Sequence, residues 1–228
     1  MNPNVEVLHG SSLALDADRQ RVLRNTYALL AVSMLPTVLG AWIGVSTGIA
    51  AMLSPMLSLV VFLAGAFGFM FAIERYKNSG AGVALLLGFT FFMGVMLSRL
   101  LAVVLSKGNG ASLVMMAFAG TSAVFFGMAL LSTVIKRDLS GLSRFLFIGA
   151  IGILVVGIAN VFIQSGALML TLSALAIFVF SAFILVDLKR VRDGEETNYV
   201  TATLGVYLSL YNVFQSLLAM FGILGGDD

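Results

Sequence analysis

The feature that most constrains this chain is the length of its uncharged stretches. No charged residue occurs from Asn25 to Ile73, a run of 49 residues, or from Phe145 to Val186, a run of 42. One helical crossing of a bilayer needs about 20 apolar residues, so each run is long enough for two crossings. Only 11% of all residues are charged and 60% are hydrophobic, so the chain lacks the polar surface of a soluble domain. We therefore expect a membrane protein.

Turn-forming residues divide the apolar sequence into seven segments. Ser54-Pro55 interrupts the first uncharged run, because proline lacks a backbone donor and disfavours helix just before itself. Gln164, Ser165 and Gly166 split the second run, and polar connections separate the remaining segments. The predicted fold class is all-α, a polytopic bundle of seven transmembrane helices. The expected helices cover residues 26–50, 55–73, 81–105, 113–135, 145–163, 167–186 and 199–221.

The distribution of Lys and Arg orients the predicted bundle in the bilayer. Eleven of the 13 lie before the first helix or after the second, fourth and sixth, which all face one side. Only Arg99 and Lys107 belong to the other side. The positive-inside rule then predicts a cytoplasmic N-terminus and a periplasmic C-terminus. We expect residues 1–24 to form a flexible cytoplasmic tail and residues 25–228 to form the transmembrane domain.

Several classes of chemistry lack the residues they need. The chain has no cysteine, and its single histidine, His9, lies in the polar tail. A zinc site, a disulfide framework or a histidine relay is therefore not expected. No nucleophile–base pair can be proposed, and the scattered basic residues indicate topology and not a nucleic-acid surface. We expect no enzyme activity, no catalytic, metal or cofactor site, and no nucleic-acid partner.

Three glycines form a stripe of small residues on the first helix. Gly40, Gly44 and Gly48 follow one another at intervals of four, so they share one face. Glycine allows two helix backbones to approach closely, which is a main source of helix packing in lipid. The stripe predicts a helix-packing face, either inside the bundle or toward another membrane protein.

Charged residues close two of the predicted helices on the side that carries most of the Lys and Arg. Glu74 and Arg75 end the second helix, and Asp187 ends the sixth. One interpretation is an interfacial ion pair or solvated helix ends. The other places Asp187 at the mouth of a polar cavity, with a basic neighbour such as Arg75 holding the carboxylate ionised. Such a site could sense pH.

The seventh predicted helix is unusually polar for a membrane span. Gly205, Ser209, Asn212 and Ser216 lie on one face, which must look into the protein because lipid offers no hydrogen bonds. Asn160 and Gln164 on the fifth helix could be partners of this face. The face predicts either hydrogen bonding between helices or a hydrated ion path.

Three segments resemble a known family. The stretch DGEETNYVTATLGVYLSLYNVFQSLLAMFG (193–222) resembles the C-terminal signature of the Bax inhibitor-1 family, in particular its bacterial branch. The segments VLRNTYALL (22–30) and AFAGTSAVFF (117–126) resemble the entry to the first helix and the fourth-helix motif of the same family. The resemblance implies a seven-helix bundle with a central helix, located in the bacterial inner membrane.

The resemblance also implies two alternative functions. Members of the bacterial branch bind and modulate the membrane protease FtsH together with HflK and HflC, and are themselves slowly degraded substrates. Other members resemble pH-sensitive calcium leak channels, in which paired aspartates on the sixth and seventh helices form the sensor. The first of these aspartates matches Asp187, whereas Ser209 occupies the position of the second. The expected partners are the lipid bilayer, FtsH and HflK–HflC, or calcium ions and protons in the alternative.

Overall fold

The computed structural model describes the backbone of residues 3–225 and the side chains of residues 17–225. All secondary structure in this part of the chain is helical, and seven helices are long and apolar enough to cross a membrane. The prediction of a seven-helix membrane bundle is thus confirmed. The helices are α1 (Pro3–Thr47), α2 (Ile49–Met52), α3 (Pro55–Tyr76), α4 (Gly80–Leu105), α5 (Gly110–Val134), α6 (Ser140–Ile163), α7 (Gly166–Asp193) and α8 (Tyr199–Leu224).

Several helices extend beyond the limits expected from the apolar runs. The sixth span, predicted to end at residue 186, continues as α7 to Asp193, where Gly194 ends it with a φ of 82°. The helical hydrogen-bond ladder does not stop where hydrocarbon stops, because Lys, Arg and Leu are good helix formers in water too. Glycine at the C-terminus then adopts the left-handed conformation that other residues avoid.

The connection between the first two spans contains two breaks, where the sequence predicted one. Gly48 ends α1 with a φ of 67°, and the short helix α2 follows. Ser54 then caps α3, because its Oγ accepts the Leu57 N–H at 3.3 Å, and Pro55 occupies the first helical position. Proline is favoured there because its missing N–H has no helical partner in any case.

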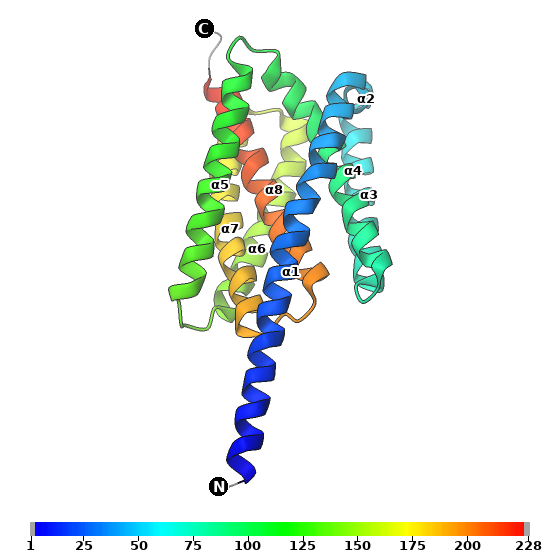
Figure 1. The fold of residues 1–228 in the computed structure, drawn as a ribbon. Helices are drawn as coiled ribbons and strands as arrows, with labels where there is room; N and C mark the ends of the chain where they lie inside the picture. The colour runs from blue at the N-terminus through cyan, green and yellow to red at the C-terminus, as the bar shows by residue number, and fades with distance from the viewer. Residues whose placement is uncertain (1–2, 226–228) are drawn as a thin grey trace.

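The segment before the first membrane span is helical and forms the N-terminal part of α1. α1 is helical from Pro3, whereas its candidate membrane span starts at Ala17. Figure 1 shows the first turns of α1 projecting well beyond the other helices. That residues 1–24 form a flexible tail stays a prediction, and the side chain of His9 lies outside the described residues.

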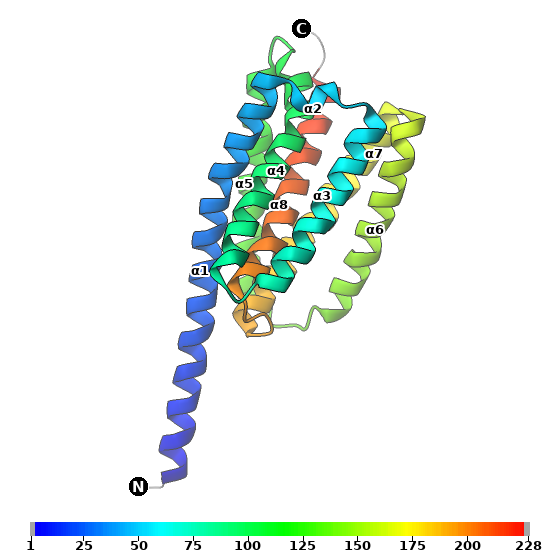
Figure 2. The same ribbon diagram turned by 90° about the vertical axis from the view of Figure 1, so that its right-hand side faces the viewer.

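The bundle is arranged around α8. This helix packs against α7, α5, α1 and α4, and Figure 1 shows it between them. α6 lies at the rim and packs mainly against α7, as Figure 2 shows from the side. The largest fully buried side chains are contributed by several helices to one core, and they include Tyr207, Phe89, Ile73, Leu86 and Met93.

The start of α1 and the end of α8 lie at opposite ends of the bundle, as an odd number of spans requires (Figure 1). The end near the N-terminus also holds the α3–α4, α5–α6 and α7–α8 connections, which carry most Lys and Arg residues. We call it the basic end. That the basic end faces the cytoplasm remains the expectation of the positive-inside rule.

Candidate functional site around Asp187

Asp187 lies on α7 and faces the backbone of α8 at Gly205. A Cβ built on Gly205 would lie 3.2 Å from Asp187 Oδ2 and 3.4 Å from its Cγ. Any larger side chain at position 205 would therefore press on the carboxylate. The glycine creates the space for the carboxylate at the contact between the two helices, and the Asp187 side chain remains half-buried.

The Asp187 carboxylate has no protein partner in the part of the chain whose side chains are described. Within residues 17–225 no hydrogen bond or ion pair reaches it, and the charges that act on it come from Arg190 and Glu196. A carboxylate among apolar helices is stable only when water solvates it or when it holds a proton. Asp187 is therefore the one acidic group of α7 whose local contacts do not explain its presence, since Asp193 pairs with Lys189 and Arg192.

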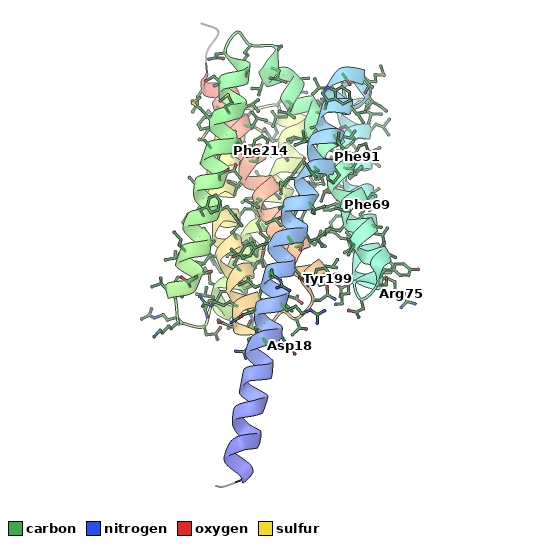
Figure 3. The ribbon with its side chains drawn as sticks, viewed as in Figure 1. Asp18, Phe69, Arg75, Phe91, Tyr199 and Phe214 are labelled. Carbon is green, nitrogen blue, oxygen red and sulfur yellow. The ribbon has the colours of Figure 1, made fainter. Side chains whose placement is uncertain are left out.

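The predicted partners of Asp187 on α3 lie elsewhere. Glu74 pairs with Lys77, one turn further along the chain. Arg75 is exposed at the end of α3, and Figure 3 shows it at the outer corner of the bundle. Because α3 packs mainly on α4, its end does not reach α7. Arg75 is therefore not the basic neighbour of Asp187; Arg190, one turn after Asp187, is the nearby basic group.

The polar face of α8 divides into separate environments. Ser209 is buried one turn after Gly205, so it follows the Asp187 contact along the same helix face. Asn212 is satisfied within α8, because its Nδ2 donates to the Leu208 carbonyl at 2.8 Å. Of the predicted α8 residues, Gly205 therefore lies against Asp187, and Ser209 follows on the same face. Asn212 has no partner on another described helix.

The partners expected on the fifth span instead close the turn between α6 and α7. Asn160 Oδ1 accepts the Ser165 N–H at 3.0 Å, and Asn160 Nδ2 donates to the Ser165 carbonyl at 3.3 Å. Gln164 ends α6 with a φ of 54°. The expectation that Asn160 and Gln164 bond to α8 is wrong, because the tight turn needs the amide of Asn160 for its own backbone.

A second polar cluster, at the centre of the bundle, was missed by the sequence analysis. The Tyr207 hydroxyl lies 2.9 Å from Thr37 Oγ1 on α1 and donates to the Thr90 carbonyl on α4 at 3.4 Å. The Tyr211 hydroxyl donates to the Met93 carbonyl at 3.3 Å. Two tyrosines four residues apart on a membrane helix were the available signal, since buried phenols require acceptors.

The glycine stripe of α1 packs inside the bundle at two of its three positions. A Cβ at Gly40 would lie 2.2 Å from the Phe91 carbonyl oxygen, and one at Gly44 would lie 2.4 Å from Ser98 Oγ. α4 contributes a reciprocal glycine, Gly94, whose Cβ would lie 2.1 Å from the Thr37 carbonyl oxygen. α4 thus covers Gly40 and Gly44, which leaves them unavailable to another protein.

Gly48, expected on the same packing face, does not pack. Nothing lies within 4 Å of the position its Cβ would take. Its positive φ ends α1, which is the reason that the stripe stops at Gly44.

Neither polar cluster has the composition of a metal site. Within the described side chains, no group of three or more His, Cys, Asp or Glu residues could hold a metal ion. Asp187 and the tyrosine cluster can instead exchange protons or hydrogen bonds, which suits a sensing or packing role better than Lewis-acid chemistry.

The sequence is similar to several known proteins of about the same length. A family model described as "Inhibitor of apoptosis-promoting Bax1" matches residues 19–226. The chain is 35% identical over 207 residues to an Escherichia coli K12 protein named "Modulator of FtsH protease YccA", covering 91% of this chain and 92% of that protein. It is also 35% identical to a Vibrio cholerae membrane protein, covering 96% of both chains, and 38% identical to a Neisseria meningitidis protein, covering 92% and 94%.

Proposed function

The chain belongs to the Bax inhibitor-1 family, and on this premise we propose that it modulates the FtsH protease in the bacterial inner membrane. The observation that carries the proposal is the identity of 35%, across nine-tenths of both chains, to the Escherichia coli protein whose name states this role. A multi-pass inner-membrane protein is already in the compartment of such a protease. The role is regulatory and needs no reaction at this chain's own residues.

The finer part of the proposal is that the chain is a slow substrate of FtsH and acts in company with HflK and HflC. An unfolding protease needs an accessible end to grip. The first turns of α1 project from the basic end and offer one (Figure 2). A chain that is gripped but extracted slowly would occupy the protease and so restrain its turnover of other membrane substrates.

Resistance to extraction is best explained by the contact between α1 and α4. Pulling on the N-terminus loads α1 first, and α1 is the helix whose glycines meet the α4 backbone. Gly40 lies under the Phe91 carbonyl and Gly94 under the Thr37 carbonyl, so the two backbones interlock. The Thr37–Tyr207 hydrogen bond then ties the same turn of α1 to the central helix α8.

Turnover in cells that contain active FtsH tests the proposal. Deletion of residues 2–20 should lengthen the lifetime of the chain, because the protease loses its grip. Gly40→Ala should shorten the lifetime, because the new methyl group separates α1 from α4, whereas Gly68→Ala on α3 should leave it unchanged, since no atom lies within 4 Å there. Unchanged turnover of the deletion variant would contradict the role of the N-terminal segment as the protease handle.

Co-purification tests the partnership independently. Affinity capture of the full chain from native membranes in mild detergent should retain FtsH, HflK and HflC. The absence of FtsH from the captured material, with the chain intact and monodisperse, would contradict the modulator proposal itself.

The second candidate function is a pH-sensitive calcium or cation leak. It is favoured by the Asp187 carboxylate, which has no partner within residues 17–225 and lies beside the α8 face of Gly205 and Ser209. Calcium flux into proteoliposomes that contain the wild-type chain or Asp187→Asn decides the question. A flux that depends on Asp187 supports the leak, and equal flux or no flux excludes it.

A further inference from the structure

A polar cavity lies at the basic end between α6 and α7. It has a volume of about 320 Å³ and lies where the α5–α6 connection meets the end of α7. Neither the tyrosine cluster nor Gly205 contributes to its walls. The lining residues come from the start of α6 and the end of α7: Asp138, Leu139, Ser140, Ser143, Arg144, Val186, Lys189, Arg190 and Glu195.

Cations outnumber anions in the walls of this cavity. The two carboxylates of the wall are already engaged, Asp138 by Ser140 and Glu195 by Arg190 at 3.8 Å. Lys189 pairs with Asp193, which lies outside the wall. Arg144 is exposed, and within residues 17–225 no carboxylate or carbonyl reaches it. The three cations of the wall are Arg144, Lys189 and Arg190.

Backbone donors without acceptors at the start of α6 also favour the binding of an anion. Leu139, at the N-cap of α6, cannot cap the helix, and Asp138 Oδ1 accepts only the Ser140 N–H, at 2.8 Å. The following amides begin a helix of 24 residues, whose N-terminus carries a partial positive charge.

An apolar surface continues from the cavity along α6. Phe147, Ile148 and Ile151 follow Arg144 at intervals of three, four and seven residues, so they lie on the same side of α6, and all three are exposed. α6 packs mainly against α7, so much of its surface faces lipid. An amphiphile with its headgroup in the cavity could therefore lay its acyl chains along these side chains. A small soluble anion would use only the polar half of this surface.

We propose that the corner between α6 and α7 binds an anionic phospholipid, with its phosphodiester at Arg144, Arg190 and the N-terminus of α6. Hydroxyl groups of a glycerol headgroup would donate to Asp138 or Glu195, the two acidic residues of the wall. A zwitterionic headgroup fits less well, because its own ammonium group would add to the excess of positive charge. Basic pockets between transmembrane helices are a recurring mode of headgroup recognition.

Native mass spectrometry of the full chain, released from nanodiscs that contain equal amounts of phosphatidylglycerol and phosphatidylethanolamine, tests the proposal. We expect preferential retention of phosphatidylglycerol by the wild type. Arg144→Gln or Arg190→Gln should each weaken that retention about fivefold, and the double variant about 25-fold. Arg75→Gln is the matched control, because it removes an exposed arginine from the same end of the bundle, far from the cavity.

Two outcomes would overturn the proposal. Equal losses in Arg144→Gln and Arg75→Gln would mean that the lipid responds to the overall charge of the basic end and not to this cavity. Displacement of the lipid by millimolar inorganic phosphate would assign the corner to a soluble anion. Retention that survives phosphate and depends on Arg144 supports the lipid site. Thermal unfolding of each variant in detergent ensures that only folded protein is compared.

Discussion

The central helix α8 and the rim helix α6 have similar lengths but opposite relations between polarity and burial. α8 is the least apolar of the seven spans, and 44% of its most apolar stretch of 18 residues is buried. α6 is among the most apolar spans, and only 6% of its corresponding stretch of 18 residues is buried. In water the apolar helix would be the inner one. In lipid the polar helix is inside, because hydrocarbon solvates Phe and Ile but leaves hydroxyl groups without partners.

The two regions are also held in different ways. Around α8 the contacts are specific: the Tyr207 hydroxyl meets Thr37 and Thr90, and glycines bring α1 onto α4. α6 contributes Leu146 to a small second cluster with Val179 and Val186 of α7, and three of its four glycines, Gly141, Gly152 and Gly157, face open space. Changes near the centre should therefore cost stability, whereas comparable changes on α6 should not.

The largest contrast is expected for alanine at glycine positions. Gly94→Ala places a methyl group about where the Thr37 carbonyl oxygen lies and should cost about 3 kcal/mol of unfolding free energy. Gly152→Ala on α6 meets no atom within 4 Å and should stabilise by about 0.5 kcal/mol through helix propensity. Thermal unfolding in detergent measures both. Equal effects would mean that the α1–α4 contact is looser than described.

Neutralising an acidic group should give effects of opposite sign at two positions of α7. Asp187→Asn removes an unpartnered carboxylate and should stabilise the bundle by about 1–2 kcal/mol at pH 8. Asp193→Asn removes the partner of Lys189 and Arg192 and should destabilise it. Denaturation in detergent at fixed pH is the measurement. A destabilising Asp187→Asn would indicate a partner that the contacts of residues 17–225 do not include.

Removing one hydroxyl group tests the central tyrosine cluster. Tyr207→Phe leaves the ring packed on Phe89 but removes the bonds to Thr37 and Thr90, at a cost of about 1 kcal/mol. Phe145→Leu on the lipid-facing side of α6 should change the unfolding free energy by less than about 0.5 kcal/mol. Tyr207→Phe would weaken the comparison if its unfolding midpoint matched that of Phe145→Leu.

The smallest effect is expected from acid at the start of α6. Hydrogen bonds from the Ser140 N–H and hydroxyl lower the pKa of Asp138 below its usual value. Its contribution to stability is therefore present above the ordinary carboxyl pKa and is lost as the pH falls through the lowered one. Hydrogen exchange at the first turn of α6 should be faster in Asp138→Ala than in wild type at pH 7, and alike in both at strongly acidic pH. A difference that persists in strong acid would contradict this origin.

Sequence reasoning located every membrane span but assigned several side chains to the wrong neighbours. The seven segments followed from hydrocarbon length, which is a property of each segment alone. Arg75 and Asp187 were placed together because both close helices at the basic end. The structure separates them, because helix ends that share a membrane depth need not be neighbours, and α3 packs mainly on α4. Asn160 failed as a partner of α8 for a local reason, since the α6–α7 turn uses its amide.

The sequence alone therefore determined that the chain resides in a membrane, how many spans it has, and that positive charge gathers at one end. These depend on local composition, which neighbouring helices do not change. Only the tertiary structure decided that Gly40 and Gly44 are covered by α4, that Gly205 leaves room for the Asp187 carboxylate, and that Tyr207 joins three helices. Lipid solvates every apolar helix face equally, so hydrophobicity cannot choose the partners; close backbone approach and hydrogen bonds choose them, and both exist only after the helices have assembled.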